Sequence, residues 1–524
     1  MLTPATSIGL SANEGDQAAV LSFLSCASGK DATVQRFDTH CSVVFLEPDR
    51  VLKIKRAVKL PYLDFSTLEK RRRACEDEIA INRRYAPTIY RRIVPITREG
   101  DGLAIGGRGP VVEWAVEMAR FDESKTLDRL AAQVALEPDL AEALAAILLE
   151  SHLKATISGG SNWLASLPGI IDRNTERFRA EAAPSRERID KLHELSHREL
   201  ARNLDLLRRR AAAGQVRRCH GDAHLGNIVL IDGRPVLFDA IEFDPEIATT
   251  DVLYDFAFPL MDLLHFGQKA PANRLFNSYM QTAWHAHSDA LRLLPLFLSI
   301  RAAIRANVLF TQHQQRPQDR TIAVNAARYF DLALQLVAPE SPCLLVIGGR
   351  SGTGKSVLAR DIAGLIAPPP GALVLRSDVI RKELYGVAEH TTLPPATYTP
   401  EASDRVYRAM IERAERALAQ GISVVLDAAF LKPSERDAAE VAARDTMVEF
   451  HGIFLTTDSG TRLQRVAARQ HDASDATPNV ALDQESIDTG DIGWEIVDAS
   501  GSPATTLDRS TSRLREASLH PVKQ

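Results

Sequence analysis

Two short segments of the 524-residue sequence carry side chains that could handle phosphate. The segment 217–244 reads RRCHGDAHLGNIVLIDGRPVLFDAIEFD, with two histidines and several carboxylates close together. The segment 348–356 reads GGRSGTGKS and matches the pattern G-x-x-x-x-G-K-[ST]. The first could be a metal site, a hydrolase site or a phosphate site, whereas the second indicates phosphate binding directly.

The glycine-rich segment predicts a loop that wraps around phosphate oxygens. Its glycines let backbone N–H groups turn inward, and the helix expected after the loop adds its positive N-terminal end. Lys355 would reach the β- and γ-phosphates, and Ser356 would ligate Mg²⁺. The apolar strand before the loop and the helix after it are the context that this pattern requires. We expect the whole loop to bind nucleotide: Gly349, Arg350, Ser351, Gly352, Thr353, Gly354, Lys355 and Ser356.

Charged residues further along could complete a kinase site around this loop. Asp427 ends the apolar run ISVVLDA, where such folds carry a second carboxylate associated with Mg²⁺. Asp378 and Arg381 follow the expected second strand, at the edge where open α/β sheets bind ligands. An aspartate there can accept a hydroxyl proton, and an arginine can hold an anion. Asp378 taken alone would equally be a helix N-cap.

A late helix in TRLQRVAARQHD carries Arg462, Arg465 and Arg469, the last two one turn apart. Such arginines can cover the phosphates and offset charge in the transition state, although each alone is also an ordinary surface residue.

Residues 343–480 resemble the small P-loop kinases, among them gluconate kinase, chloramphenicol phosphotransferase, zeta-toxin and the kinase part of polynucleotide kinase. The resemblance rests on the P-loop, on Asp378-x-x-Arg381 and on the late arginines. It implies that Asp378 is the catalytic base, that Arg381 anchors the substrate, and that Arg465 or Arg469 touches ATP.

The segment around Asp222 can be tested against each alternative. As a zinc site, His220, Asp222 and His224 have a strand-like spacing, and no further ligand with a general-base glutamate follows. As a serine hydrolase, the segment lacks a nucleophile elbow. As a core strand it would bury several polar side chains, which is costly unless they have partners.

Phosphoryl transfer fits the order of the residues. Protein kinases carry H-R-D-x-x-x-x-N, in which the aspartate takes the hydroxyl proton and the asparagine binds Mg²⁺. His220, Asp222 and Asn227 have the same spacing, and an Asp-Gly hairpin then leads to Asp239, where the second magnesium-binding aspartate belongs. Gly221 in place of the arginine disfavours a regulated protein kinase.

The N-terminal region could supply the other half of this site. Lys53 lies on an expected strand and Glu78 on the helix after it, and such a pair would grip the α- and β-phosphates. Lys55 lies on the same strand face and could take the role instead. We prefer Lys53.

These residues resemble the aminoglycoside phosphotransferase family, whose pattern HGD-x-H-x-x-N and later aspartate match residues 220–227 and Asp239. VLKIKRAVKLPYLDFSTLEKRRRACEDEIAINRRYAP and DVLYDFAFPLMDLL extend the match to two-domain bacterial proteins that join such a domain to a P-loop kinase. The resemblance then covers nearly the whole chain. It implies ATP and Mg²⁺, with Asp222 as base and Asn227 and Asp239 as metal ligands. It does not imply antibiotic resistance, because fold does not fix the acceptor.

The rest of the sequence predicts the elements that position these residues. Residues 40–58 predict a hairpin, 65–85 a helix, and 124–213 helices almost throughout. Beyond VAPESP (337–342), strands and helices alternate as in a parallel sheet.

We expect a mixed α/β and α+β chain of two domains. Residues 1–337 would form a bilobal protein-kinase-like fold and 340–524 a doubly wound, parallel-sheet P-loop kinase fold. Residues 475–524 are polar and poorly periodic, so the sequence does not say whether they close the second sheet.

Composition narrows the partners and the location. The net charge of -5 argues against broad nucleic-acid binding, and five dispersed cysteines without a CxxC pair fit reduced thiols. The start of the chain has no signal-peptide pattern, and the apolar stretch 252–264 is too short to span a bilayer. We expect a cytoplasmic protein that binds no membrane; the sequence does not predict its oligomeric state.

Together these features predict a bifunctional kinase that transfers the γ-phosphoryl group of ATP to hydroxyls of small molecules such as sugars or sugar acids. Two alternatives remain open. One half could be catalytic while the other senses ATP, or the P-loop half could be a polynucleotide 5′-kinase.

Overall fold

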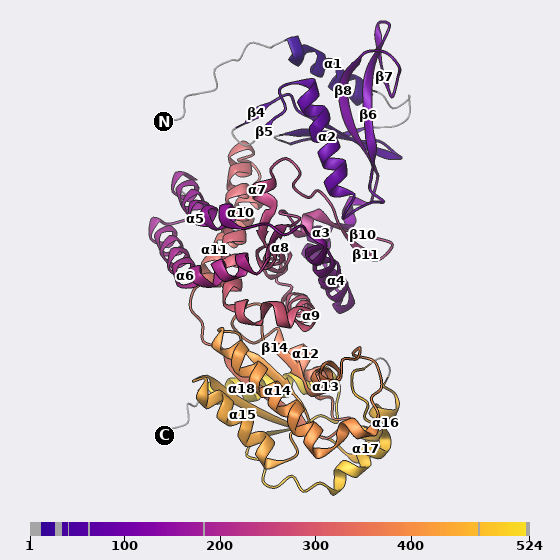
Figure 1. Ribbon diagram of the computed structural model, residues 1–524. Helices are drawn as coiled ribbons and strands as arrows, with labels where there is room; N and C mark the ends of the chain where they lie inside the picture. Colours follow the sequence, from indigo (N-terminus) through magenta and orange to yellow (C-terminus); the bar gives the residue numbers. More distant parts are fainter. Residues whose placement is uncertain are drawn as a thin grey trace. The chain divides into compact units, whose positions relative to one another are not determined.

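The computed structural model describes residues 12–26, 34–39, 41–60, 63–181, 184–469 and 472–519 (Figure 1). The chain divides into two compact units. The first consists of Met1–Val134, Glu150–Leu167 and Leu207–Pro259, and the second of Ala135–Leu149, Pro168–Leu206 and Leu260–Gln524.

An antiparallel six-stranded sheet opens the first unit, in the order β1-β2-β3-β8-β6-β7. Its strands are β1 (Gln35–Asp38), β2 (Ser42–Leu46), β3 (Arg50–Lys55), β6 (Tyr90–Glu99), β7 (Gly102–Ile105) and β8 (Val111–Ala119), with β4 (Lys59–Leu60) and β5 (Leu63–Asp64) as a separate ladder. β2 and β3 pair around residues 47–49, so the hairpin predicted for 40–58 is confirmed.

Helices cover both faces of this sheet. α1 (Ala12–Cys26) packs through Val20 and Leu24 on the face that includes Leu52 and Ile54. α2 (Leu68–Asn82) packs on the opposite face, beside Val51. Because side chains alternate along a strand, Lys53 and Lys55 share the face of Val51 and point toward α2.

Helices follow the sheet from residue 127, as predicted, with short ladders around the segment 217–244. The helices are α3 (Leu127–Gln133), α4 (Pro138–Lys154), α5 (Ser161–Glu181), α6 (Arg186–Ala212), α7 (Pro245–Ala248), α8 (Val252–His265), α9 (Lys269–His287), α10 (Leu294–Gln315) and α11 (Arg320–Val337). The ladders are β9 (Val216–Arg218) with β12 (Thr249–Asp251), and β10 (Ile228–Ile231) with β11 (Arg234–Leu237). Short 3-10 turns are η1 (Glu123–Lys125), η2 (Leu225–Asn227) and η3 (Ser288–Leu293).

A five-stranded parallel sheet forms the last part of the second unit, in the order β14-β15-β13-β16-β17. Its strands are β13 (Cys343–Gly349), β14 (Leu373–Arg376), β15 (Val424–Asp427), β16 (Glu449–Thr456) and β17 (Glu495–Asp498). The helices of this part are α12 (Lys355–Ala363), α13 (Ser377–Leu384), α14 (Pro400–Ala419), α15 (Pro433–Asp445), α16 (Ser459–Ala467), α17 (Pro478–Asp483) and α18 (Pro503–Leu519), with η4 (Pro395–Tyr398) and η5 (Gln484–Ser486). The central strand β13 is apolar and buried on both faces, as in parallel sheets covered by helices.

Residues 475–519, which the sequence left unassigned, close this sheet. β17 pairs in parallel with β16, and α18 packs on α12. Val497 of β17 and Leu507 and Leu514 of α18 join the core that includes Leu345 and Ile347.

Among the described residues, one helical stretch, Lys269–Gln315, is long and apolar enough to cross a membrane. It lies outside the stretch 252–264, which we expected to be too short to span a bilayer. Of its most apolar window, 72% is buried within the protein, which is also how a core helix behaves. The five cysteines, all among the described residues, are free thiols, as expected.

Gly452→Ala tests the packing of the last strand. A methyl group at Gly452 would lie 2.4 Å from the indole ring of Trp494, just before β17. Because the ring must move, we expect the free energy of unfolding to fall by about 1–3 kcal/mol. The loss would be measured as a lower midpoint of thermal unfolding, together with a changed tryptophan fluorescence signal. Gly493→Ala is the matched control, since a methyl group there meets nothing within 4 Å. Equal stability of the two variants would contradict this packing.

Candidate active sites

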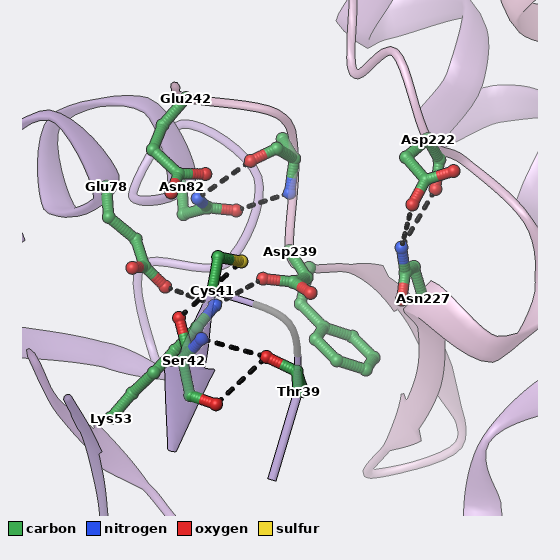
Figure 2. A network of polar contacts seen from close by, with 12 residues as sticks. Thr39, Cys41, Ser42, Lys53, Glu78, Asn82, Asp222, Asn227, Asp239 and Glu242 are labelled. Carbon is green, nitrogen blue, oxygen red and sulfur yellow. Dashed lines mark hydrogen bonds and ion pairs between the residues drawn. The ribbon is translucent and has the colours of Figure 1, made fainter. Parts of the chain in front are cut away.

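The ammonium group of Lys53 is the centre of the first candidate site (Figure 2). Its Nζ lies 2.8 Å from Oε1 of Glu78 on α2 and 2.7 Å from Oδ1 of Asp239. Burial disfavours the charged ammonium, yet Asp239 and Glu78 together raise the pKa of Lys53 well above its ordinary value. Burial likewise opposes the charge on Glu78, but Lys53 and Lys55 hold the pKa of that carboxyl below its ordinary value. The pair predicted from the sequence is therefore formed and charged.

Lys55, the alternative to Lys53, belongs to the same network on its inner side. Its Nζ lies 2.6 Å from Oε2 of Glu78 and 2.5 Å from Oε1 of Glu242, and its side chain is almost fully buried. Lys53 alone of the two contacts Asp239, whose side chain is 45% exposed. The geometry favours Lys53 as the lysine that meets a ligand, with Lys55 fixing the second oxygen of Glu78.

The loop that carries Asp239 is held by α2. The side-chain oxygen of Asn82 accepts the N–H of Ala240 at 2.7 Å, and its amide group donates to the carbonyl of Ala240 at 3.2 Å (Figure 2). The N–H of Asp239 donates to the hydroxyl of Tyr90 at 3.1 Å. Asp239 has a φ of 60°, an unfavourable region for an aspartate, which these bonds stabilise. Glu78 and Asn82, one helical turn apart, thus position Lys53 and Asp239 together.

The predicted catalytic loop places Asp222 and Asn227 beside each other. The Asn227 amide donates to the backbone oxygen of Asp222 at 3.0 Å and to its Oδ2 at 3.2 Å (Figure 2). Gly221, where protein kinases have arginine, has a φ of 83°, and a Cβ there would lie 2.9 Å from that of Ala248. The predicted Asp-Gly hairpin is confirmed, since β10 and β11 pair with Arg234 opposite Ile231.

The histidines of this loop do not converge on a metal. His220 is fully buried, its Nε2 lies 3.0 Å from the carbonyl oxygen of Phe238, and burial lowers its pKa, so it is a neutral structural group. The Nδ1 of His224 accepts the N–H of Gly226. The zinc alternative therefore lacks its ligand set.

The second candidate site lies where β13 turns into α12. Gly349, Gly352 and Gly354 all have positive φ, and a Cβ at Gly352 would lie 2.5 Å from the carbonyl oxygen of Arg462. The Thr353 hydroxyl donates to the carbonyl of Arg350 at 2.8 Å, and Nζ of Lys355 donates to the same oxygen at 3.1 Å. The loop therefore has the glycine-dependent path that brings backbone amides and Lys355 toward one anion.

Two aspartates accompany Lys355, as predicted. Asp427 ends β15, and Asp378 lies in the first turn of α13, after β14. Burial and the charge of Asp427 raise the pKa of Asp378. Burial lowers the pKa of Lys355, although Asp427 and Asp378 oppose this effect. A partly desolvated lysine beside carboxylates is suited to bind an anion held with a cation.

The arginines predicted for the second site contact different parts of the protein. Arg381 is buried, donates to the carbonyl of Thr397 at 2.7 Å and lies 4.7 Å from the ring of Tyr398. Arg465 donates to the carbonyls of Ala499 and Gly501, after β17. Arg469 lies near enough to Lys355 to affect its pKa. Arg462, named with them, is buried and donates to the carbonyl of Ser351 in the P-loop.

Three residues around the two sites were not predicted from the sequence. Asn82 gave no signal beyond its place on the apolar face of its helix. Arg376 ends β14, two residues before Asp378, and bridges Asp427 at 3.2 Å and Asp472 at 2.8 Å. Its position at a strand end was a usable signal. Gln484, whose side-chain oxygen accepts the N–H of Ser351, lies in the polar segment that the sequence left unassigned.

Two family models match separate parts of the chain. Residues 68–292 match the model of the Phosphotransferase enzyme family, and residues 344–486 match that of an AAA domain. Both candidate sites have residues inside these matches, whereas Lys53 lies before the start of the match at residue 68.

A relative spans most of the chain. Uncharacterized protein Rv2004c of Mycobacterium tuberculosis is 30% identical over 457 residues, which are 85% of this chain and 88% of that protein. The chain belongs to the same family, in which a phosphotransferase domain of the aminoglycoside phosphotransferase type precedes a P-loop kinase domain. The chain is a phosphotransferase enzyme, and the predicted fold class is confirmed.

Solved structures match each part separately. A gluconokinase from Sinorhizobium meliloti is 22% identical and covers 35% of this chain and 100% of its own, with a TM-score of 0.26. A choline/ethanolamine kinase family protein from Mesorhizobium loti is 13% identical and covers 62% of this chain and 99% of its own, with a TM-score of 0.36.

Asn82→Ala tests whether α2 holds the loop of Asp239. The variant removes the hydrogen-bond partner of the N–H and C=O of Ala240, which lowers the local free energy of opening by about 1–3 kcal/mol. We expect the amide of Ala240 to exchange with solvent roughly 5- to 150-fold faster, as measured by hydrogen exchange on peptides covering 239–242. Glu76→Gln, on the exposed side of the same helix, is the control. Unchanged exchange in Asn82→Ala would show that this side chain does not hold the loop.

Proposed function

We propose that the protein is an ATP- and Mg²⁺-dependent kinase with two separate active sites. Each site would transfer the γ-phosphoryl group of ATP to a hydroxyl group of a small molecule, such as a sugar or sugar acid. The observation that carries this proposal is the placement of Lys53 between Glu78 and Asp239, combined with a complete P-loop elsewhere in the chain. Two unrelated sets of phosphate-binding residues have no simpler explanation in one chain.

In the first site, Lys53 would bind the α- and β-phosphates, with Glu78 fixing its orientation. Asp222 would accept the proton of the acceptor hydroxyl as the phosphoryl group is transferred. Asn227 and Asp239 offer oxygen atoms, which suit Mg²⁺, and the Asp239 side chain is half-exposed and so accessible. Bound there, Mg²⁺ would offset the charge that develops on the transferred group.

In the second site, the backbone amides of 349–356 and Lys355 would surround the phosphates. Asp378 would accept the acceptor proton, and its raised pKa suits a base poised closer to neutral pH. Ser356 and Asp427 are the oxygen donors available for Mg²⁺. Arg381 would anchor the acceptor after its contact with Thr397 rearranges, whereas Arg469 is better placed than Arg465 to reach the phosphates.

The remaining expectations extend this proposal. We propose that the two activities correspond to residues 1–337 and 340–524, that the acceptors are small molecules rather than nucleic acid or lipid, and that the protein acts in the cytoplasm. The net charge of -5 supports the exclusion of nucleic acid as the general acceptor.

Asp222→Asn and Lys355→Ala separate the two activities. We expect Asp222→Asn to lower phosphoryl transfer by the first site about 10²- to 10⁴-fold, since it removes the base. Lys355→Ala should lower transfer by the second site about 10²- to 10³-fold, since it removes charge stabilisation. The assay follows ADP formation with a panel of sugars, sugar acids, nucleosides and aminoglycosides.

Matched controls are Asp232→Asn, in the turn between β10 and β11, and Lys432→Ala, an exposed residue before α15. Both should keep full activity. Loss of one and the same activity in both test variants would mean that one half is catalytic and the other senses ATP. Transfer unaffected by either variant would overturn the proposal.

A further inference from the structure

A polar seam runs between α5 and α6, which pack antiparallel in the second unit. Asp172 contacts His197 at 2.8 Å, and Thr175 contacts His193 at 3.1 Å. One turn further, Arg179 contacts Asp190 at 2.6 Å. Each contact lies one turn from the next on both helices, so the seam fixes the register of the pair.

Three side chains of this seam converge. His193 and His197, four residues apart, lie on one face of α6, with ring centroids 4.5 Å apart. Oδ1 of Asp172 on α5 lies 2.8 Å from Nε2 of His197 and 4.0 Å from Nδ1 of His193. One ligand atom from each residue lies within 4.8 Å of the other two. Tetrahedral zinc with bonds of about 2.0–2.1 Å spaces its ligand atoms roughly 3.3 Å apart, so only small side-chain adjustments are needed.

The site is open enough for an ion to enter, and the neighbouring side chains keep their partners when it binds. The two histidine side chains are 36% and 33% exposed and that of Asp172 is 49% exposed. The hydroxyl of Thr175 donates to the carbonyl of Ile171 at 3.0 Å, and it keeps this bond if His193 turns to a metal. The nearby Arg179 is paired with Asp190, which offsets its charge.

The chemistry of the ligands selects the ion. Two imidazoles and one carboxylate suit Zn²⁺, Co²⁺ and Ni²⁺, whereas Mg²⁺ and Ca²⁺ prefer oxygen ligands alone. Three protein ligands leave a fourth position for water. None of the three residues belongs to either candidate active site, and the function proposed above does not require them.

We propose that Asp172, His193 and His197 bind one Zn²⁺ ion, which cross-links α5 and α6. The two helices would then be joined by the metal ion as well as by their packing. Because the ion binds the folded protein and not the unfolded chain, it also stabilises this part of the chain.

The test uses the full chain, purified without a polyhistidine tag and stripped of metal with a chelator. Zn²⁺ is titrated by calorimetry in excess Mg²⁺, so that oxygen sites are already filled. We expect one Zn²⁺ per chain and a higher melting temperature with the metal. Co²⁺ should give the absorption of a four-coordinate site without a thiolate charge-transfer band, because no cysteine is a ligand.

His193→Ala, His197→Ala and Asp172→Asn should each weaken Zn²⁺ binding at least roughly tenfold. Controls are Asp190→Asn, which removes a neighbouring charge and its bridge to Arg179 but no proposed ligand, and His285→Ala, an exposed histidine on α9. Circular dichroism and melting temperature in chelator verify that every variant is folded as the wild type. Three results would overturn the proposal: absence of stoichiometric binding in the wild type, a thiolate band with Co²⁺, or histidine variants that bind Zn²⁺ as tightly as the wild type does.

Discussion

The ion network around Lys53 is the interaction on which the first site depends. Its members come from three distant segments: β3, helix α2 and the loop after β11. Burying such charges is unfavourable unless each is paired, and a buried ion network is rarely the cheapest way to stabilise a fold. Lys55 and Glu242 extend the pairing inward, so that Glu78 is held by two lysines while Lys53 and Asp239 lie at its more exposed end. The network therefore presents one cation and one carboxylate to a ligand in fixed positions.

The second site also presents positive charge to a ligand, but with different groups. There the positive groups are mainly backbone N–H groups at the start of α12, and three glycines with positive φ allow the chain to turn that way. Lys355 adds a point charge whose pKa is lowered by burial, in contrast to Lys53, whose pKa is raised by two carboxylates. The first site is centred on side chains from three segments and the second on one loop, and the two sites share no residue.

The features predicted best from the sequence are those that depend on neighbouring residues. The P-loop, the spacing of Asp222 and Asn227 and the Asp-Gly turn before Asp239 all depend on residues within a few positions of one another. Contacts between distant segments that no motif marks were not predicted. These are the hydrogen bonds of Asn82 to Ala240, the bridge from Arg376 to Asp472, and the bond of Arg465 to Ala499. β17 was missed for a different reason. It is an edge strand in which only Val497 is buried, so it lacks the apolar pattern by which strands are recognised.

The most direct measurement of the central claim is the number of nucleotides bound per chain. Isothermal titration of the full chain with a non-hydrolysable ATP analogue and Mg²⁺ should give two bound nucleotides. Lys53→Met and Lys355→Ala should each leave one, and the double variant none. A single nucleotide in the wild type, or both losses caused by the same substitution, would contradict two independent sites.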